Sequence, residues 1–225
     1  MNTTSRAPAA RRLPPEERER SIVEGAAELA LESGLDTLTV RAVAAHVGVT
    51  PALVAHYRPV MDAFVAEVFG AIVAAERDEV LDAFSPAGGL RVSLQRLVET
   101  LLDDSREDVA LIWVQAWSLG VRNEPLGERV RAEMDAWQSR LEEVIAGAAS
   151  ADPDDSADPP FAAWMLLAMV DGMSAHSLVK WAPRDRAGLA RRTVAAVLDR
   201  PSASAGESSA TAAESSATPT SEDRP

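Results

Sequence analysis

The sequence of 225 residues contains no cysteine, which excludes disulfide bonds and thiol catalysis. Histidine is almost as scarce, and the wide spacing of His46, His56 and His176 matches no metal-binding pair of the HExxH kind. No metal site and no cofactor are therefore predicted. Lysine occurs once, at Lys180, so arginine supplies almost all of the positive charge.

Long apolar runs are also missing. The most apolar stretch, residues 161–179, is interrupted by Asp171, Gly172 and His176, which favours a buried helix over a membrane span of about 20 residues. The N-terminus carries arginines with no apolar run behind them, which does not match a secretory signal. We therefore expect a cytoplasmic protein with no membrane partner.

No segment alternates apolar and polar residues for long enough to form a strand, whereas helical spacing recurs throughout. The sequence thus predicts an all-α fold of about nine helices. Two short helices follow Thr39 and Thr50, and the other expected ranges are 16–33, 60–84, 90–104, 107–121, 124–148, 160–181 and 185–199. Residues 1–13 and 201–225 lack this periodicity, so we expect a disordered arm and a disordered tail.

The stretch from Thr39 to Phe64 matches a helix-turn-helix motif. Thr39 is the expected N-cap of the first short helix, and Gly48 occupies the turn after it. Thr50 caps the second short helix, whose first position is Pro51. Together with the helix over 16–33, these two short helices give three helices within residues 14–60, which indicates a DNA-binding head.

The formal net charge of −13 does not contradict a DNA-binding head, because it is unevenly distributed. Residues 1–60 contain seven arginines and seven acidic residues, which sum to zero, so the whole excess of negative charge follows residue 60. Screening over about 8–10 Å at physiological salt limits the influence of this distant charge on the head.

Residues 22–66 resemble the N-terminal domain of the TetR family of bacterial transcriptional regulators. The residues that carry this resemblance are Thr39, Ala44, Gly48-Val49-Thr50, His56-Tyr57 and Pro59. The resemblance implies an N-terminal helix-turn-helix domain and a helical C-terminal bundle, residues 61–200, that dimerises and binds a small molecule. It also implies a homodimeric repressor that binds a palindromic double-stranded DNA operator and is released by that effector.

Three positions depart from the family pattern. Ala55 stands where the family usually has a tyrosine, Arg58 where it has an aromatic residue, and Met61 where it has a phosphate-binding lysine. Arg58 replaces part of the missing phosphate contact only if it points toward DNA. A helical ligand-binding or interaction protein with a weakened DNA-binding head is therefore the alternative function.

The predicted DNA contacts follow from the motif and the resemblance. Phosphate contacts are expected from Thr39, Arg41, Thr50, His56 and Tyr57, and base contacts from Pro51, Ala52 and Leu53. In the N-terminal arm, Arg6, Arg11 and Arg12 are candidates for the minor groove.

The C-terminal part offers candidates for a ligand pocket and a dimer interface. Tryptophans and methionines are able to line an adaptable apolar cavity, with polar groups such as Asp171 to orient a ligand. The pocket candidates are Trp113, Gln115, Trp117, Trp164, Met165, Met169, Met173 and His176, although ordinary core packing explains the same spacing. The dimer candidates are Leu167, Val170, Leu178, Leu189, Val194 and Val197, with burial of both helices inside one subunit as the alternative. No catalytic motif is present, so we predict no enzyme activity.

Overall fold

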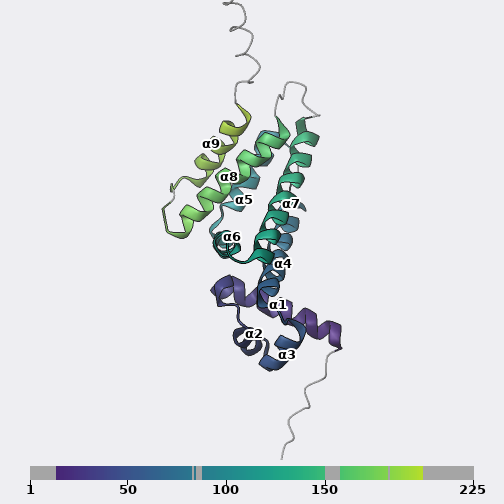
Figure 1. The fold of residues 1–225 in the computed structure, drawn as a ribbon. Coiled ribbons are helices and arrows are strands. Elements are labelled where there is room, and N and C mark those ends of the chain that lie inside the picture. The colour runs from purple at the N-terminus through teal and green to yellow at the C-terminus, as the bar shows by residue number, and fades with distance from the viewer. Residues whose placement is uncertain (1–13, 83, 85–87, 150–157, 182, 200–225) are drawn as a thin grey trace, which may run out of the picture.

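The computed structural model describes residues 14–82, 84, 88–149, 158–181 and 183–199 (Figure 1). Within these residues the chain forms nine α-helices and two short 3-10 helices, and no strand. The α-helices are α1 Pro15–Ser33, α2 Val40–Val47, α3 Pro51–Tyr57, α4 Met61–Asp82, α5 Leu90–Leu101, α6 Glu107–Gly120, α7 Glu124–Ala149, α8 Pro159–Leu178 and α9 Arg186–Leu198. The 3-10 helices are η1 Leu35–Thr37 and η2 Asp104–Arg106. The predicted all-α fold is thus confirmed, whereas the arm (1–13) and the tail (201–225) lie outside the described residues.

The helices of the N-terminal head begin and end at the residues that the sequence marks. The Thr39 side chain accepts a hydrogen bond from the Ala42 N–H at 3.1 Å, and that of Thr50 accepts one from the Leu53 N–H at 3.3 Å. Gly48 ends α2 in the left-handed region, with φ 73° and ψ 34°, where a β-carbon is unfavourable. These caps fix the turn that presents α3 on the outside of the head.

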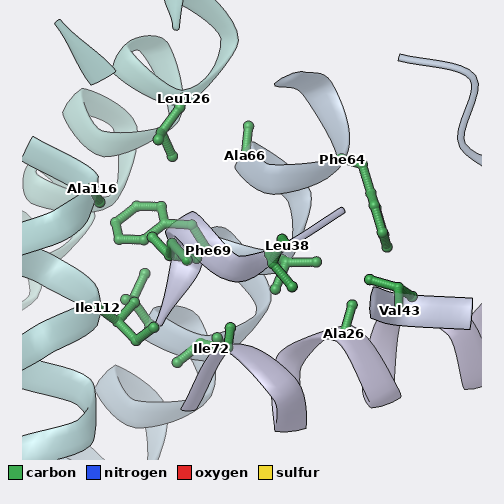
Figure 2. Close-up of a cluster of buried hydrophobic side chains, with 14 of the residues drawn as sticks. Ala26, Leu38, Val43, Phe64, Ala66, Phe69, Ile72, Ile112, Ala116 and Leu126 are labelled. Atoms are coloured by element: carbon green, nitrogen blue, oxygen red, sulfur yellow. The ribbon is translucent and has the colours of Figure 1, made fainter. Parts of the chain in front are cut away.

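α4 joins the head to the C-terminal body (Figure 1). Its side chains share one hydrophobic core with α1, α2 and α6, so the head and the body are not packed as separate units. Figure 2 shows this core, in which Ala26 and Val43 of the head and Ile112 of α6 gather around α4 residues such as Phe69. A shift of α6 is therefore expected to reach the head through close-packed side chains.

A second hydrophobic core holds the body together. It is built from α5, α7, α8 and α9 with the end of α4, and its fully buried members include Leu94, Leu141, Ile145, Ala163 and Val194. The predicted helix over 160–181 ends earlier, at Leu178, because Lys180 adopts a left-handed backbone with φ 59°.

α8 is long and apolar enough, by length and composition, to cross a membrane, but it packs against α6, α7 and α9 within the body. The sequence predicted a buried helix, and only one side of α8 is buried. In the most apolar 18-residue segment of α8, 22% of the segment is buried within the single chain. The outward side carries Trp164, Ala168, Gly172 and Val179, all exposed.

Candidate nucleic-acid interface and buried cavity

The eight predicted DNA contacts gather on the N-terminal end of α2 and on α3. Val54 is fully buried and anchors α3 in the head, and Tyr57 packs partly against the same core, while most other positions of this helix face outward. Leu53 and Tyr57 are half-buried, and the exposed ones are Thr39, Arg41, Thr50, Pro51, Ala52 and His56. The sequence therefore identified a surface that the fold does leave open.

Hydroxyl and guanidinium groups on this surface are available to donate hydrogen bonds. The Thr39 and Thr50 oxygens accept bonds from backbone N–H groups, which leaves each O–H free to donate to a phosphate oxygen. Arg41 is exposed and forms no ion pair with any other residue in the described part of the chain. A phosphate group is therefore able to approach these three side chains without breaking an internal contact.

Arg58 belongs to the interior of the head and not to its outer surface. Its Nη1 lies 2.6 Å from Oε1 of Glu19 on α1, and its Nε lies 2.7 Å from Oε2 of Glu67 on α4. The side chain is only 13% exposed, and the guanidinium lies 5.6 Å from the ring centroid of Phe64. Burial lowers the pKa of Arg58, but the two carboxylates outweigh it and raise this pKa. Arg58 thus ties α1 to α4 and does not replace the missing phosphate contact.

The body contains a cavity of about 310 Å³ between α4, α6, α7 and α8. This volume is at the lower end of the range of roughly 300–1,000 Å³ for small-molecule sites. Four tryptophans line it, Trp113 and Trp117 from α6, Trp137 from α7 and Trp164 from α8. The ring centroids of Trp113 and Trp117 are 5.9 Å apart, so the α6 pair forms one continuous aromatic wall.

Two buried carboxyl groups face the same cavity in different environments. Glu76 lies 3.4 Å from Nη1 of Arg106 and accepts a hydrogen bond from Trp113. Burial raises the pKa of Glu76, although Arg106 opposes this increase. Asp171 has no hydrogen bond or ion pair with any described residue, and burial followed by the charge of Glu76 raises its pKa to about 7.

Three of the eight predicted pocket residues, Trp113, Trp117 and Trp164, line this cavity. The other five do not. Met165, Met169 and Met173 pack against the second core, and His176 is exposed, with its ring centroid 4.9 Å from that of Trp181. Their helical spacing placed them on α8, but they belong to faces of that helix that turn away from the cavity.

Gln115 also lies away from the cavity, because it is two residues from Trp113 and therefore on another face of α6. Its Oε1 accepts a hydrogen bond from the Leu35 N–H at 2.6 Å, and its Nε2 donates to Oδ1 of Asp36 at 3.0 Å. Gly34 permits this approach, since a β-carbon there would lie 2.6 Å from Gln115 Nε2. Gln115 thus connects α6 to the turn that precedes the helix-turn-helix.

The residues that sequence reasoning missed come from helices without an obvious signal. Glu76 is one of several acids along α4, and Trp137 and Gln138 lie on an amphipathic helix whose inner face resembles ordinary core. Asp171 was recognised both as a polar interruption of an apolar stretch and as a polar group able to orient a ligand. The tryptophans of α6 and α8 and this interruption are the signals in the sequence that pointed to the cavity.

The predicted dimer residues divide into two groups. Val170, Val194 and Val197 lie in the second core and are at most 6% exposed, so they offer no surface to another copy. Leu167 lines the cavity, whereas Leu178 and Leu189 are half-buried. Three of the six predicted residues therefore lie on the inward sides of α8 and α9, and the dimer interface stays a prediction.

Comparisons with known proteins agree with this architecture. Residues 22–68 match the family model described as bacterial regulatory proteins, tetR family, and residues 90–201 match the model for the C-terminal part of BetI-type transcriptional repressors. No curated protein sequence matches the chain significantly.

Solved structures share the fold at low sequence identity. A putative TetR-family transcriptional regulator from Rhodococcus sp. has a TM-score of 0.65 at 22% sequence identity, over 81% of this chain and 99% of that one. A putative transcriptional regulator from Pseudomonas aeruginosa PAO1 has a TM-score of 0.65 at 23% sequence identity, over 84% of this chain and 93% of that one. The multidrug binding protein EbrR, crystallised with proflavin, has a TM-score of 0.62 at 20% sequence identity, over 80% of this chain and 99% of that one. On the two family models, which together span the head and the body, the chain belongs to the TetR family of transcriptional regulators.

Proposed function

We propose that this chain is a ligand-responsive repressor that binds a palindromic operator as a homodimer and is released from DNA by a small molecule. The observation that carries the proposal is the double role of α6. Trp113 and Trp117 of this helix line the cavity, while Gln115 between them holds the turn before α2. We place the protein in the cytoplasm, where such regulators meet DNA.

The coupling between the cavity and the head follows from packing. Ile112 and Ala116 of α6 are fully buried in the core that α6 shares with the head. A ligand that moves the tryptophan wall must move α6, and a close-packed core transmits that displacement to neighbouring helices. The ligand then favours the arrangement of the two heads that does not fit successive major grooves.

The exposed side of α8 supports dimerisation. Trp164 is 60% exposed and Val179 is 76% exposed, and the small residues Ala168 and Gly172 lie between them. Large exposed apolar groups around small residues favour the close approach of a second helix. A twofold pairing through α8 would bury this face and set two recognition helices at a fixed spacing. For the small-molecule part of the proposal, support comes from the shared fold of EbrR, a multidrug binding protein crystallised with proflavin.

The alternative, a ligand-binding protein with a weakened DNA-binding head, is favoured by two positions. Arg58 is held inside the head by its two carboxylate partners. Met61, at the first position of α4, is half-buried against the head core and offers no charge to a phosphate. Arg41 is then the main cationic contact expected from the described part of the head.

Selection of operators from random double-stranded DNA, followed by a salt titration, tests the proposal. We expect enrichment of a palindrome that binds the chain more tightly than random DNA at about 150 mM salt, since base contacts add to the phosphate contacts. Dimerisation and ligand binding without such a preference would reject the repressor and support the alternative.

A further inference from the structure

The cavity carries an excess of negative charge in the residues that line it. Glu76 of α4, Asp135 of α7 and Asp171 of α8 are acidic, and Arg106 of η2 is the single basic residue among them. Three acids and one base leave the ionised cavity with a charge of about −2, and a low-polarity surrounding strengthens its attraction for a cation.

Arg106 is already committed to other carboxylates. It lies 3.4 Å from Glu76 through Nη1 and 3.0 Å from Glu79 through Nη2. Glu76 also accepts a hydrogen bond from Trp113, so both its charge and its oxygens are engaged. Neither Glu76 nor Arg106 is free to bind an ionic ligand without losing one of these contacts.

Asp171 is the largely buried carboxyl group that lacks a partner, whereas Asp135, which also pairs with no described residue, is exposed to solvent. It is largely buried, receives no hydrogen bond from any described residue, and faces the negative charge of Glu76. A buried carboxylate is unfavourable unless a cation or a hydrogen-bond donor compensates it. The cavity therefore offers one largely buried acidic group without a partner, and a ligand that supplies one positive charge satisfies it.

The tryptophans define the rest of the ligand. Trp113 and Trp117 form a continuous wall, Trp137 is buried on α7, and Trp164 lies at the exposed side on α8. Indole faces attract both flat aromatic groups and cations. Two buried atoms of lining residues, Trp117 Nε1 and Gln138 Oε1, have no hydrogen-bond partner in the described part of the chain.

We propose that the cavity binds a flat aromatic monocation, whose charge pairs with Asp171 and whose rings stack on the Trp113–Trp117 wall. This inference rests on the proposed ligand-responsive function and names the chemical class of the ligand. A neutral apolar ligand would leave Asp171 without a partner, and an anion would meet the excess of acidic groups.

The test uses the full chain without DNA and two tricyclic probes of the same shape. N-methylacridinium carries a permanent positive charge, and acridine is neutral at about pH 8. Titration calorimetry and quenching of tryptophan fluorescence measure both affinities. We expect the cation to bind at least about tenfold more tightly, because its charge pairs with ionised Asp171, whereas neutral acridine leaves that carboxylate uncompensated.

Asp171→Asn removes the charge and keeps the size of the side chain. It should weaken binding of N-methylacridinium by about ten- to hundredfold and leave acridine binding almost unchanged. Asp82→Asn is the matched control, since Asp82 is an exposed acid of α4 outside the cavity. In the unaltered chain, the affinity for the cation should rise about tenfold from about pH 6 to about pH 8, as Asp171 ionises.

Equal affinity for the two probes, no binding of either probe, or full cation affinity in Asp171→Asn would overturn the inference. An equal loss in Asp82→Asn would overturn it too, since the effect would then reflect net charge. These results are separate from the repressor test. If only a neutral compound releases the operator, the repressor function stands and the aromatic-cation ligand is rejected. If the cation binds through Asp171 but does not release the operator, the cation site stands and the ligand-responsive repressor is rejected.

Discussion

Replacing Asp171 by asparagine should stabilise the ligand-free protein, because the carboxyl group serves binding at the expense of folding. In the native state Asp171 keeps its proton up to about pH 7, whereas the unfolded chain releases it near the usual pKa of 3.8. The native state therefore binds more protons between these two values, and the free energy of unfolding falls as the pH rises through this window.

The size of the effect follows from the pKa difference. About three pKa units at about 1.4 kcal/mol each correspond to at most about 4 kcal/mol. The advantage of Asp171→Asn over the unaltered chain should grow from about 1–2 kcal/mol at about pH 5 to at most about 4 kcal/mol above pH 7. The advantage of Asp171→Asn thus increases by about 2–3 kcal/mol between the two pH values. For a chain of this length, that increase corresponds to roughly 5–10 °C in Tm.

Thermal unfolding followed by helical circular dichroism measures this difference at both pH values. Protein concentration must be held constant, because dimer formation makes Tm depend on concentration. Asp82→Asn, the exposed control on α4, should follow the unaltered chain at both pH values. A variant whose advantage is the same at both pH values would refute the argument that Asp171 is buried without a partner.

Further predictions concern the head, its coupling to the body and the dimer. Arg58→Ala should lower stability by about 1–2 kcal/mol while leaving the salt dependence of DNA binding unchanged, whereas Arg41→Ala should reduce that dependence by about one phosphate contact. A changed salt slope in the first variant would mean that Arg58 does reach DNA. Met61→Lys should tighten DNA binding and steepen its salt dependence by about one contact, because a lysine stem can pack where the half-buried methionine lies and present its charge outside. Gln115→Ala should preserve ligand affinity but reduce ligand-induced release of the operator, measured by fluorescence anisotropy, and unchanged release would show that this contact does not transmit the signal. Gly172→Glu should yield monomers in analytical ultracentrifugation, since it places a charge on the exposed face of α8, and a persistent dimer would place the interface elsewhere.

The helices and the helix-turn-helix were predictable because their signals are local. Thr39 and Thr50 cap the helices that follow them, and Gly48 adopts the left-handed turn that its sequence context predicts. Capping and helical periodicity depend on residues within one or two turns, which the sequence displays directly. The sequence also identified Arg58 as a departure from the family pattern, but it did not show whether the side chain points toward DNA or into the head.

The tertiary structure alone decided which side of each helix meets which neighbour. Periodicity places Trp113 and Gln115 on different faces of α6, but only packing shows that one lines the cavity and the other holds Asp36. Likewise, Glu76 and Asp171 become neighbours because α4 and α8 line the same cavity. The two carboxyl groups differ because Arg106 forms an ion pair with Glu76 and not with Asp171. Burial and charge pairing are long-range properties, so the sequence by itself determined the elements and the reading head, and the packed body determined where a ligand can bind.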